Sequence, residues 1–401
     1  MTSRLKFGDC AELRSEKVDP KTSQESNYIG LEHIEQQSLT LAGHGFGSDV
    51  DSQKQKFYKG DILFGKLRPY FRKVVVAPFD GICSTDIWVV KPKAGVDRNF
   101  LFYWMASEEF IASSTQASEG GRMPRAKWDW VSKFELKFRD SDEQKAIGKV
   151  LRLLDEKIEA NKVVAQTLED IAETIFKSWF VNFDPVKLKM AGMKPSGMST
   201  ALAALFPDSM VDSEIGLIPK GWKLHSVGDL ITPKKGKTIT RATCTHGIVP
   251  VVAGGLQPAY FHNQSNVSQP AVTISASGAN AGFVRLYLED IWASDCSYIN
   301  SEVSEYVFFW YLFLSNNQEK IYSMQQGAAQ PHIYPSDLMR LKLCAPQKSE
   351  LFKIFEVTAS PLFSQILCLE RQNKLLTEIR DSLLPRLISG ELDIPIEIIA
   401  S

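Results

Sequence analysis

The chain has 401 residues, of which 44% are hydrophobic, 23% charged and 10% aromatic. This composition is typical of folded globular proteins and excludes collagen-like, mucin-like and wholly disordered chains. With 46 basic residues against 47 acidic ones the formal net charge is −1, so any nucleic-acid contact must be made by local basic patches. At about 150 residues per domain, the length predicts two or three domains.

The chemistry-bearing motifs are mostly missing from the sequence. The six cysteines lie far apart without a C-x-x-C pair, and the six histidines include no H-E-x-x-H pair. Gly236-Lys237-Thr238 is not a phosphate loop, because the position where that motif needs its first glycine is Ile231. The longest apolar run, residues 307–314, is far shorter than the roughly 18 residues that span a bilayer. We therefore predict a noncatalytic, metal-free, cytoplasmic protein without membrane contact.

The two halves of the chain resemble each other. Residues 81–87 (GICSTDI) match residues 291–297 (IWASDCS), which places Asp86 and Asp295 at an offset of 209. A loop at 120–125 has a counterpart at 326–332, and each loop leads to a short alternating strand, at 134–138 and 341–344. Repetition at a near-constant offset indicates duplication. The sequence predicts an α/β fold with two similar domains, residues 1–140 and 219–346.

Each predicted domain is followed by a long helix with apolar residues at heptad spacing, at 141–183 and 347–392. We expect Pro361 to kink or restart the second helix. Residues 184–218 read as a linker with a short helix near 200–205, and residues 393–401 as a tail. The residues predicted to pair the helices are Leu151, Leu154, Ile158, Asn161, Leu168, Ile175, Leu362, Ile366, Leu369, Asn373, Leu376 and Leu383.

One asparagine-lysine pair occurs in each apolar stripe, at Asn161-Lys162 and Asn373-Lys374. A seam asparagine costs stability but fixes the register and the partner of a coiled coil. Alternatively, both asparagines lie on the solvated edge of the stripe.

Several strings give the chain a family resemblance. They include residues 28–32 (YIGLE), 60–70 (GDILFGKLRPY), 178–185 (SWFVNFDP), 218–222 (IPKGW) and 380–390 (RDSLLPRLISG). Together with their order and the duplication, they make the sequence resemble the specificity subunit of a type I restriction-modification system.

The resemblance implies two α/β target-recognition domains held apart by an antiparallel pair of long helices, each domain reading one half of a split sequence in double-stranded DNA. It also implies partners: two methyltransferase subunits that modify adenine, and motor/nuclease restriction subunits. S-adenosylmethionine, ATP and Mg are then expected on those partners, with no cofactor on this chain.

The residues themselves indicate where DNA contacts lie. Residues 56–73 carry six basic side chains against one acidic one, with aromatic residues interleaved. Basic side chains neutralise phosphates, whereas Arg, Asn and Gln also read base edges. An ordinary solvated strand or hairpin is the alternative for each segment. The predicted DNA contacts are Lys66, Arg68, Tyr70, Arg72, Lys73, Arg122, Arg125, Lys127, Lys234, Lys235, Lys237, Arg241, Asn280, Arg285, Gln330 and His332.

Two other functions compete with this one. The chain is alternatively a structural adaptor whose coiled coil spaces two protein-binding domains, or a DNA-binding repressor that acts without a partner enzyme. Only binding to phosphates predicts affinity that falls steeply with salt, which separates the adaptor from the DNA-binding hypotheses.

Overall fold

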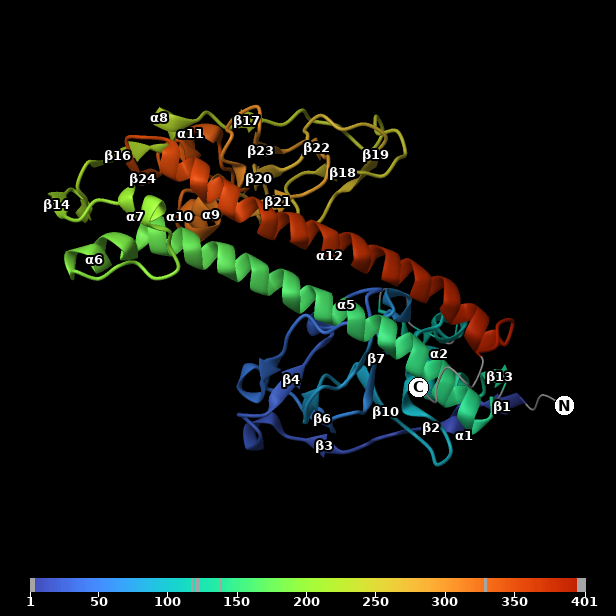
Figure 1. Cartoon of the computed structure of the whole chain (residues 1–401). Helices are drawn as coiled ribbons and strands as arrows, with labels where there is room; N and C mark the ends of the chain where they lie inside the picture. Colours follow the sequence, from blue (N-terminus) through green and yellow to red (C-terminus); the bar gives the residue numbers. More distant parts are fainter. Residues whose placement is uncertain (1–3, 117, 120–122, 138, 328–329, 395–401) are drawn as a thin grey trace. The chain divides into compact units, whose positions relative to one another are not determined.

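The computed structural model describes residues 4–116, 118–119, 123–137, 139–327 and 330–394. It divides into two compact units, residues 1–160 with 372–401 and residues 161–371. Each unit contains one α/β domain, called domain 1 and domain 2 below, and one half of each of two long helices, α5 (Ser141–Phe176) and α12 (Glu350–Ser389) (Figure 1). The units therefore divide within the helices, whereas the sequence analysis treated each helix as a segment of its own.

Domain 1 contains two main sheets. The first is antiparallel, and its inner strands are buried apolar runs that pack on short helices. Its strands, in spatial order, are β2 (Ala11–Leu13), β10 (Ile87–Pro92), β7 (Ile62–Gly65) and β8 (Val74–Val76). The helices are α1 (Phe7–Cys10), α2 (Arg98–Ala106), α3 (Glu108–Gln116) and α4 (Trp128–Val131). Residues 100–106 of α2 are all buried, which explains why this helix is apolar on every side.

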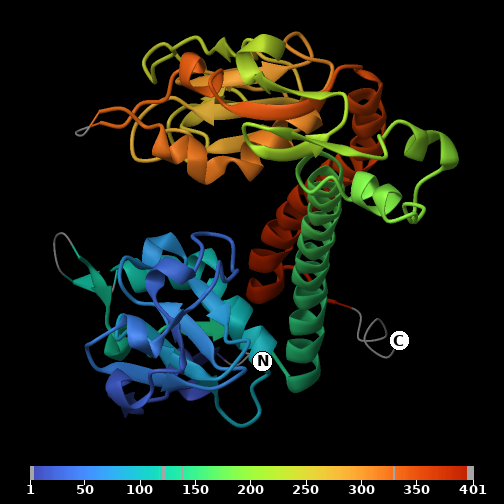
Figure 2. The same ribbon diagram turned by 90° about the vertical axis from the view of Figure 1, so that its left-hand side faces the viewer.

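The second sheet of domain 1 combines parallel and antiparallel pairs. Its order is β3 (Lys17–Val18), β6 (Lys54–Phe57), β9 (Gly81–Cys83), β4 (Asn27–Ile29) and β5 (Gly45–Phe46), with β4 and β9 parallel. Two further pairs are β1 (Arg4–Lys6) with β13 (Glu135–Lys137) and β11 (Ser118–Glu119) with β12 (Arg125–Ala126). The hairpin of β11 and β12, teal in Figure 2, stands out from the domain.

Domain 2 repeats the antiparallel sheet strand for strand and three strands of the second sheet. Its antiparallel sheet has the order β17 (Lys234–Lys235), β23 (Cys296–Asn300), β20 (Ala271–Ser275) and β21 (Val284–Tyr287). Its second sheet, β19 (Tyr260–His262), β18 (Val249–Val252) and β22 (Trp292–Ala293), again contains one parallel pair, β18 with β22. A terminal pair, β16 (Trp222–Ser226) with β24 (Lys342–Pro346), matches β1 with β13. The helices are α8 (Val227–Leu230), α9 (Val307–Asn316), α10 (Gln318–Ser323) and α11 (Pro335–Leu338). The predicted duplication of an α/β domain is therefore confirmed.

The two long helices run antiparallel within each unit. Leu151, near the start of α5, shares a core with Leu384 and Ile388, near the end of α12. Phe176, at the end of α5, lies 6.0 Å from the ring of Phe355, near the start of α12. Each helix therefore begins beside the end of the other, as the resemblance implied.

Burial along the helices follows the predicted stripe. Of the predicted pairing residues, Leu151, Ile158, Asn161, Ile366 and Leu369 are buried, and Leu154, Leu168, Ile175, Leu362, Asn373, Leu376 and Leu383 are half-buried. Asn161, at 2% exposed, lies inside the stripe rather than on its solvated edge.

The expectation that Pro361 restarts the second helix is wrong, while the expected kink stays a prediction. α12 passes through Pro361 and Pro385 without a break. A proline in a helix removes one hydrogen bond to the carbonyl four residues earlier, here at Val357 and Asp381. Both of those residues are exposed, so water can replace the missing donor.

Residues 184–218, predicted to be a linker, hold regular structure and pack onto domain 2. They contain α6 (Asp184–Met190), α7 (Thr200–Ala204) and a hairpin of β14 (Met210–Ser213) with β15 (Gly216–Pro219). Val186, Phe206 and Ile218 are buried in the core of unit 2. The glycines and prolines of this segment form its turns, while its scattered apolar residues attach it to the domain.

α12 is long and apolar enough to cross a membrane on length and composition alone. Its buried residues pack on α5 and α9, as expected for a core helix of a folded protein.

Candidate nucleic-acid interface

The predicted basic segments of domain 1 meet at one turn. The turn follows β7 and begins at Lys66, and backbone hydrogen bonds join it to the segment that leads into β12. Arg68 N–H donates to the Pro124 carbonyl at 2.8 Å, and Ala126 N–H donates to the Lys66 carbonyl at 2.9 Å. Lys66 N–H donates in turn to the Asp86 carbonyl at 2.9 Å. Three segments separated by up to 60 positions therefore form one surface. This surface, made of residues 66–73, Asp86 and residues 123–127, is called turn 1 below.

Domain 2 contains the same hydrogen bonds. Gly278 N–H donates to the Pro331 carbonyl at 3.0 Å, Ile333 N–H to the Ala276 carbonyl at 3.0 Å, and Ala276 N–H to the Asp295 carbonyl at 3.1 Å. This surface is called turn 2. When the matching hydrogen bonds are aligned, Lys66 corresponds to Ala276, Arg68 to Gly278, Tyr70 to Asn280, and Arg125 to His332.

Both turns have left-handed backbone at two matching positions. In turn 1 these are Arg68 and Arg72, with φ of 51° and 49°, and in turn 2 they are Gly278 and Gly282, with φ of 83° and 88°. Glycine adopts this conformation without strain, whereas an arginine there carries a conformational cost. Turn 1 accepts that cost at two arginines, so other contacts must hold its backbone in place.

Turn 1 exposes a cluster of cationic and aromatic side chains. Arg125 and Lys127 are exposed, Tyr70 is 44% exposed, and Lys66 and Arg68 are half-buried. Arg122 lies outside the described residues. Such a cluster can neutralise phosphates and offer a ring for contact with sugar or base.

Arg125 is held by a carboxylate. Its Nε donates to Asp86 Oδ1 at 2.7 Å, and a terminal nitrogen donates to Asp86 Oδ2 at 3.0 Å. These hydrogen bonds raise the pKa of the Arg125 guanidinium above its ordinary value, and like every arginine it is charged at neutral pH. The side chain of Arg125 remains 47% exposed, so the guanidinium is both oriented and accessible.

Turn 2 has a different side-chain chemistry. Asp295, which matches Asp86, accepts a hydrogen bond from the hydroxyl of Ser277. His332 stacks on Tyr334 with ring centroids 6.0 Å apart, and Gln330 is exposed. Asn280 lies half-buried in the turn. Turn 2 is therefore rich in neutral hydrogen-bonding groups where turn 1 is cationic.

The structure contradicts the prediction that Arg72 is a surface contact. Arg72 is 9% exposed, its Nε donates to the Ala106 carbonyl at 2.7 Å, and its guanidinium lies 3.7 Å from Asp381 of α12. Lys73 also turns inward, since its Nζ donates to the Leu31 carbonyl at 2.5 Å and burial lowers its pKa. Both cations therefore tie turn 1 to the rest of domain 1, Arg72 through the last residue of α2 and Lys73 through the Leu31 carbonyl.

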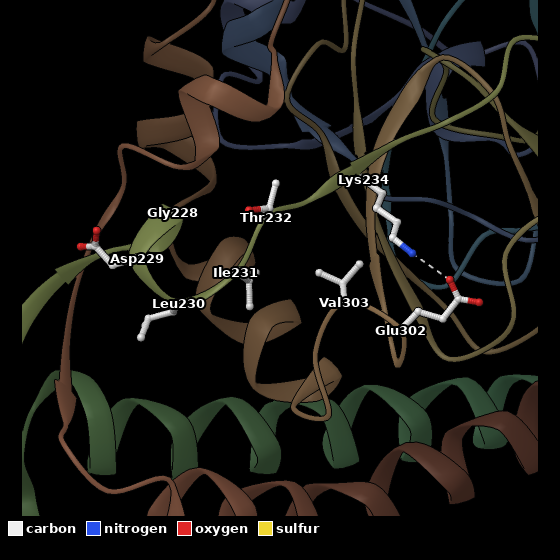
Figure 3. A pocket seen from close by; sticks show the side chains of 8 residues that line it. All are labelled: Gly228, Asp229, Leu230, Ile231, Thr232, Lys234, Glu302 and Val303. Atoms are coloured by element: carbon white, nitrogen blue, oxygen red, sulfur yellow. Dashed lines mark hydrogen bonds and ion pairs between the residues drawn. The ribbon is translucent and has the colours of Figure 1, made fainter.

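The remaining predicted residues of domain 2 lie apart from the backbone frame of turn 2. Lys235, Lys237 and Arg241 are exposed on β17 and the loop that follows it. Lys234 forms an ion pair with Glu302 at 2.9 Å beside an open pocket (Figure 3). Arg285 on β21 donates to the Leu256 carbonyl at 2.6 Å and lies 5.0 Å from the Tyr287 ring centroid. These cations lie on β17, on the loop that follows it and on β21, outside the backbone hydrogen bonds that define turn 2.

Two residues of turn 1 were missed by the sequence analysis. Asp86 was used only to align the repeats, although its position one residue before β10 places it beside Arg125. Gln37 lies outside the basic stripe, yet its side-chain amide donates to the Tyr70 carbonyl at 3.0 Å and it lines a pocket with Tyr70. The repeat of Asp86 at Asp295 was the available signal for the first, and no local pattern marks the second.

The described residues contain no cluster of three or more metal-binding side chains. Burial raises the pKa of Cys83 and Cys296 to about 12 and that of Cys10 and Cys344 to about 11. These four thiols therefore stay protonated at neutral pH and act as small apolar core residues.

Comparison with known proteins agrees with this architecture. Repeated α/β domains with a surface turn on each, joined to paired long helices, define a class of duplicated two-domain proteins. The family model described as type I restriction modification DNA specificity domain matches residues 4–170 and 219–374. The chain therefore belongs to the family of type I restriction-modification specificity subunits.

Individual relatives are distant but cover most of the chain. The chain is 28% identical to the HindI specificity subunit of Haemophilus influenzae, over 86% of this chain and 89% of that one. It is 24% identical to the MjaIX specificity subunit of Methanocaldococcus jannaschii, over 84% and 78% of the two chains. The crystal structure of the type I S subunit from M. genitalium has the same fold, with a TM-score of 0.57, 16% identity, and coverage of 98% of this chain and 96% of that one.

Proposed function

We propose that this chain reads a two-part sequence in double-stranded DNA, one part through turn 1 and the other through turn 2. The observation that supports this most directly is the repetition of the turn: the same backbone hydrogen bonds hold two turns whose exposed side chains differ. A frame that is kept while its side chains change suits two sites that bind one kind of ligand and read different sequences. The paired helices would set the number of unread base pairs between the parts.

The side chains of the turns fit the chemistry of DNA. Lysine and arginine neutralise phosphates and supply affinity without sequence preference. Arginine, asparagine, glutamine and histidine present donors and acceptors that distinguish base edges in the major groove. Turn 1 carries Arg125, and turn 2 carries Asn280, Gln330 and His332.

We further propose that the chain is noncatalytic and works in the cytoplasm within a larger complex. Two methyltransferase subunits would bind S-adenosylmethionine and modify adenine, and motor/nuclease restriction subunits would bind ATP and Mg. The relatives support this proposal, because they too are named as specificity subunits.

Methylation by a reconstituted complex tests the proposal. The chain and its methyltransferase subunits are expected to methylate a two-part motif in a random DNA library, whereas the chain alone transfers no methyl group. Exchanging residues 1–140 for those of a relative is expected to change one part of the motif only. A change in both parts, or methyl transfer by the chain alone, would refute the proposal.

A second measurement addresses the adaptor hypothesis. The affinity of the chain for random duplex, measured with and without its methyltransferase subunits, is expected to fall steeply as salt rises, because each neutralised phosphate releases counterions. Affinity that does not change with salt would favour an adaptor that makes no DNA contact.

A further inference from the structure

Turn 1 contains an arginine whose orientation is fixed while its outer edge is open. Asp86 takes the edge of the Arg125 guanidinium formed by Nε and one terminal nitrogen, at 2.7 and 3.0 Å. A guanidinium has five N–H donors in a rigid plane, so the edge formed by its two terminal nitrogens keeps two parallel donors. Among the described residues, Asp86 is the only side chain that hydrogen-bonds to Arg125.

The open edge of Arg125 matches one base in particular. Guanine presents two adjacent acceptors, O6 and N7, in the major groove, and two parallel N–H donors fit them in a bidentate contact. Adenine offers an acceptor beside a donor, and cytosine and thymine present only one polar group each on that edge. We propose that Arg125 reads a guanine in the part of the target bound by domain 1, and that Asp86 is the positioning residue that aims it. This inference rests on the proposed function and adds a base identity to it.

Attachment of the loop does not explain the ion pair. Two backbone hydrogen bonds already join the strand that carries Arg125 to the loop after β7. They run from Arg68 N–H to the Pro124 carbonyl and from Ala126 N–H to the Lys66 carbonyl. Domain 2 attaches the matching segment by the same bonds with His332 in place of Arg125, and its Asp295 pairs with Ser277 instead.

Stability explains only a small part of the ion pair, even though its geometry is bidentate. Exposed ion pairs contribute little because solvent screens them and ordering the side chains costs entropy. The pair does orient the guanidinium before DNA arrives, which lowers the entropic cost of binding.

The test uses the complex of the chain with its methyltransferase subunits, and reads the methylated motif from a random DNA library. The wild-type complex is expected to require a guanine, on either strand, at one position of the part assigned to domain 1 by the domain exchange. Arg125→Ala and Arg125→Lys are both expected to relax that single position by about tenfold to a hundredfold, because lysine keeps the charge but loses the fork. Asp86→Asn is expected to relax the same position by a smaller factor.

Matched controls separate this inference from the proposed function. His332→Ala, at the corresponding position of domain 2, is expected to leave the domain 1 part of the motif unchanged. A two-part motif without guanine in the domain 1 part, or an Arg125→Ala complex whose motif is unchanged, would overturn the inference while leaving the proposed function standing. Equal weakening at every position would also overturn it, because that result is expected of a phosphate contact. A wild-type complex with no defined motif would instead refute the proposed function.

Discussion

The two domains have the same turn but contact the long helices in different ways. Tyr103 of α2 and Tyr311 of α9 occupy matching positions, and each donates its hydroxyl to a carboxylate of α5, Asp155 for the first and Glu169 for the second. In domain 1 the carboxylate also binds Arg380 of α12 at 2.7 Å. In domain 2 the neighbour from α12 is Phe363, whose ring lies 5.8 Å from that of Tyr311.

The network of domain 1 extends to turn 1. Arg380 also contacts Asp381 at 3.0 Å, and Asp381 lies 3.7 Å from Arg72. Turn 2 has Gly282 at the position of Arg72 and needs no such support, because glycine adopts the left-handed backbone freely. The comparison teaches that the turn can be held either by intrinsic backbone preference or by a partly buried ionic network.

The largest effect is expected from removing the centre of that network. Arg380 is 2% exposed, so Arg380→Met leaves Asp155 and Asp381 without their shared cation. The side chains of Arg380 and Asp155 are 2% and 15% exposed, and removing one partner of a buried ion pair costs up to about 3–5 kcal/mol of unfolding free energy. Hydrogen exchange of peptides from α2 and turn 1 should speed up, while peptides from α9 should keep their protection.

The control for this prediction lies in domain 2. Glu169→Gln keeps an acceptor for the Tyr311 hydroxyl and is expected to cost only about 1 kcal/mol, seen in α9. Equal effects of the two variants on both domains would break the comparison.

A pH effect is expected in domain 2. Glu356 of α12 accepts the backbone N–H groups of Phe308 and Phe309 at 2.9 and 3.2 Å, yet burial outweighs these bonds and raises its pKa from 4.5 to about 7. The folded domain therefore holds this proton more tightly than the unfolded chain does. Its stabilising contribution is complete below about pH 4.5 and is lost as the pH rises to about 7, which amounts to at most about 3 kcal/mol.

Denaturant unfolding at pH 5 and pH 7.5 measures this effect. Glu356→Gln, which cannot ionise, is expected to remove this decrease in stability with rising pH. The protection of α2 in domain 1 against hydrogen exchange serves as the internal reference. A wild-type domain 2 that gains stability relative to Glu356→Gln as the pH rises would contradict the assignment.

The smallest effect is expected from an exposed lysine on β17. Lys235→Ala is expected to weaken DNA binding equally for all sequences and to reduce the slope of log affinity against log salt by about one. Titrations at several salt concentrations measure the slope, and the methylated motif should not change. A base-specific change would mean that domain 2 reads sequence from β17 as well as from turn 2.

Much of the fold could be predicted from the sequence. The heptad stripe marks the buried face of α5 and α12 because burial along a helix follows its period, and Leu151 and Ile366 are buried accordingly. The repeat predicted two similar domains because matching sequences bury matching strands. The basic stripe near Lys66 and the loop with Arg125 were also visible as local composition.

Only the tertiary structure decided which of these cations face solvent and what they contact. Arg72 and Arg125 look alike in the sequence, yet the first is buried against α2 and α12 and the second is exposed and paired with Asp86. Asp86 and Arg125 are 39 positions apart, and the order of the strands alone brings them together. Local sequence fixes the period of burial, but the partner of a charge depends on which distant segments the fold places beside it.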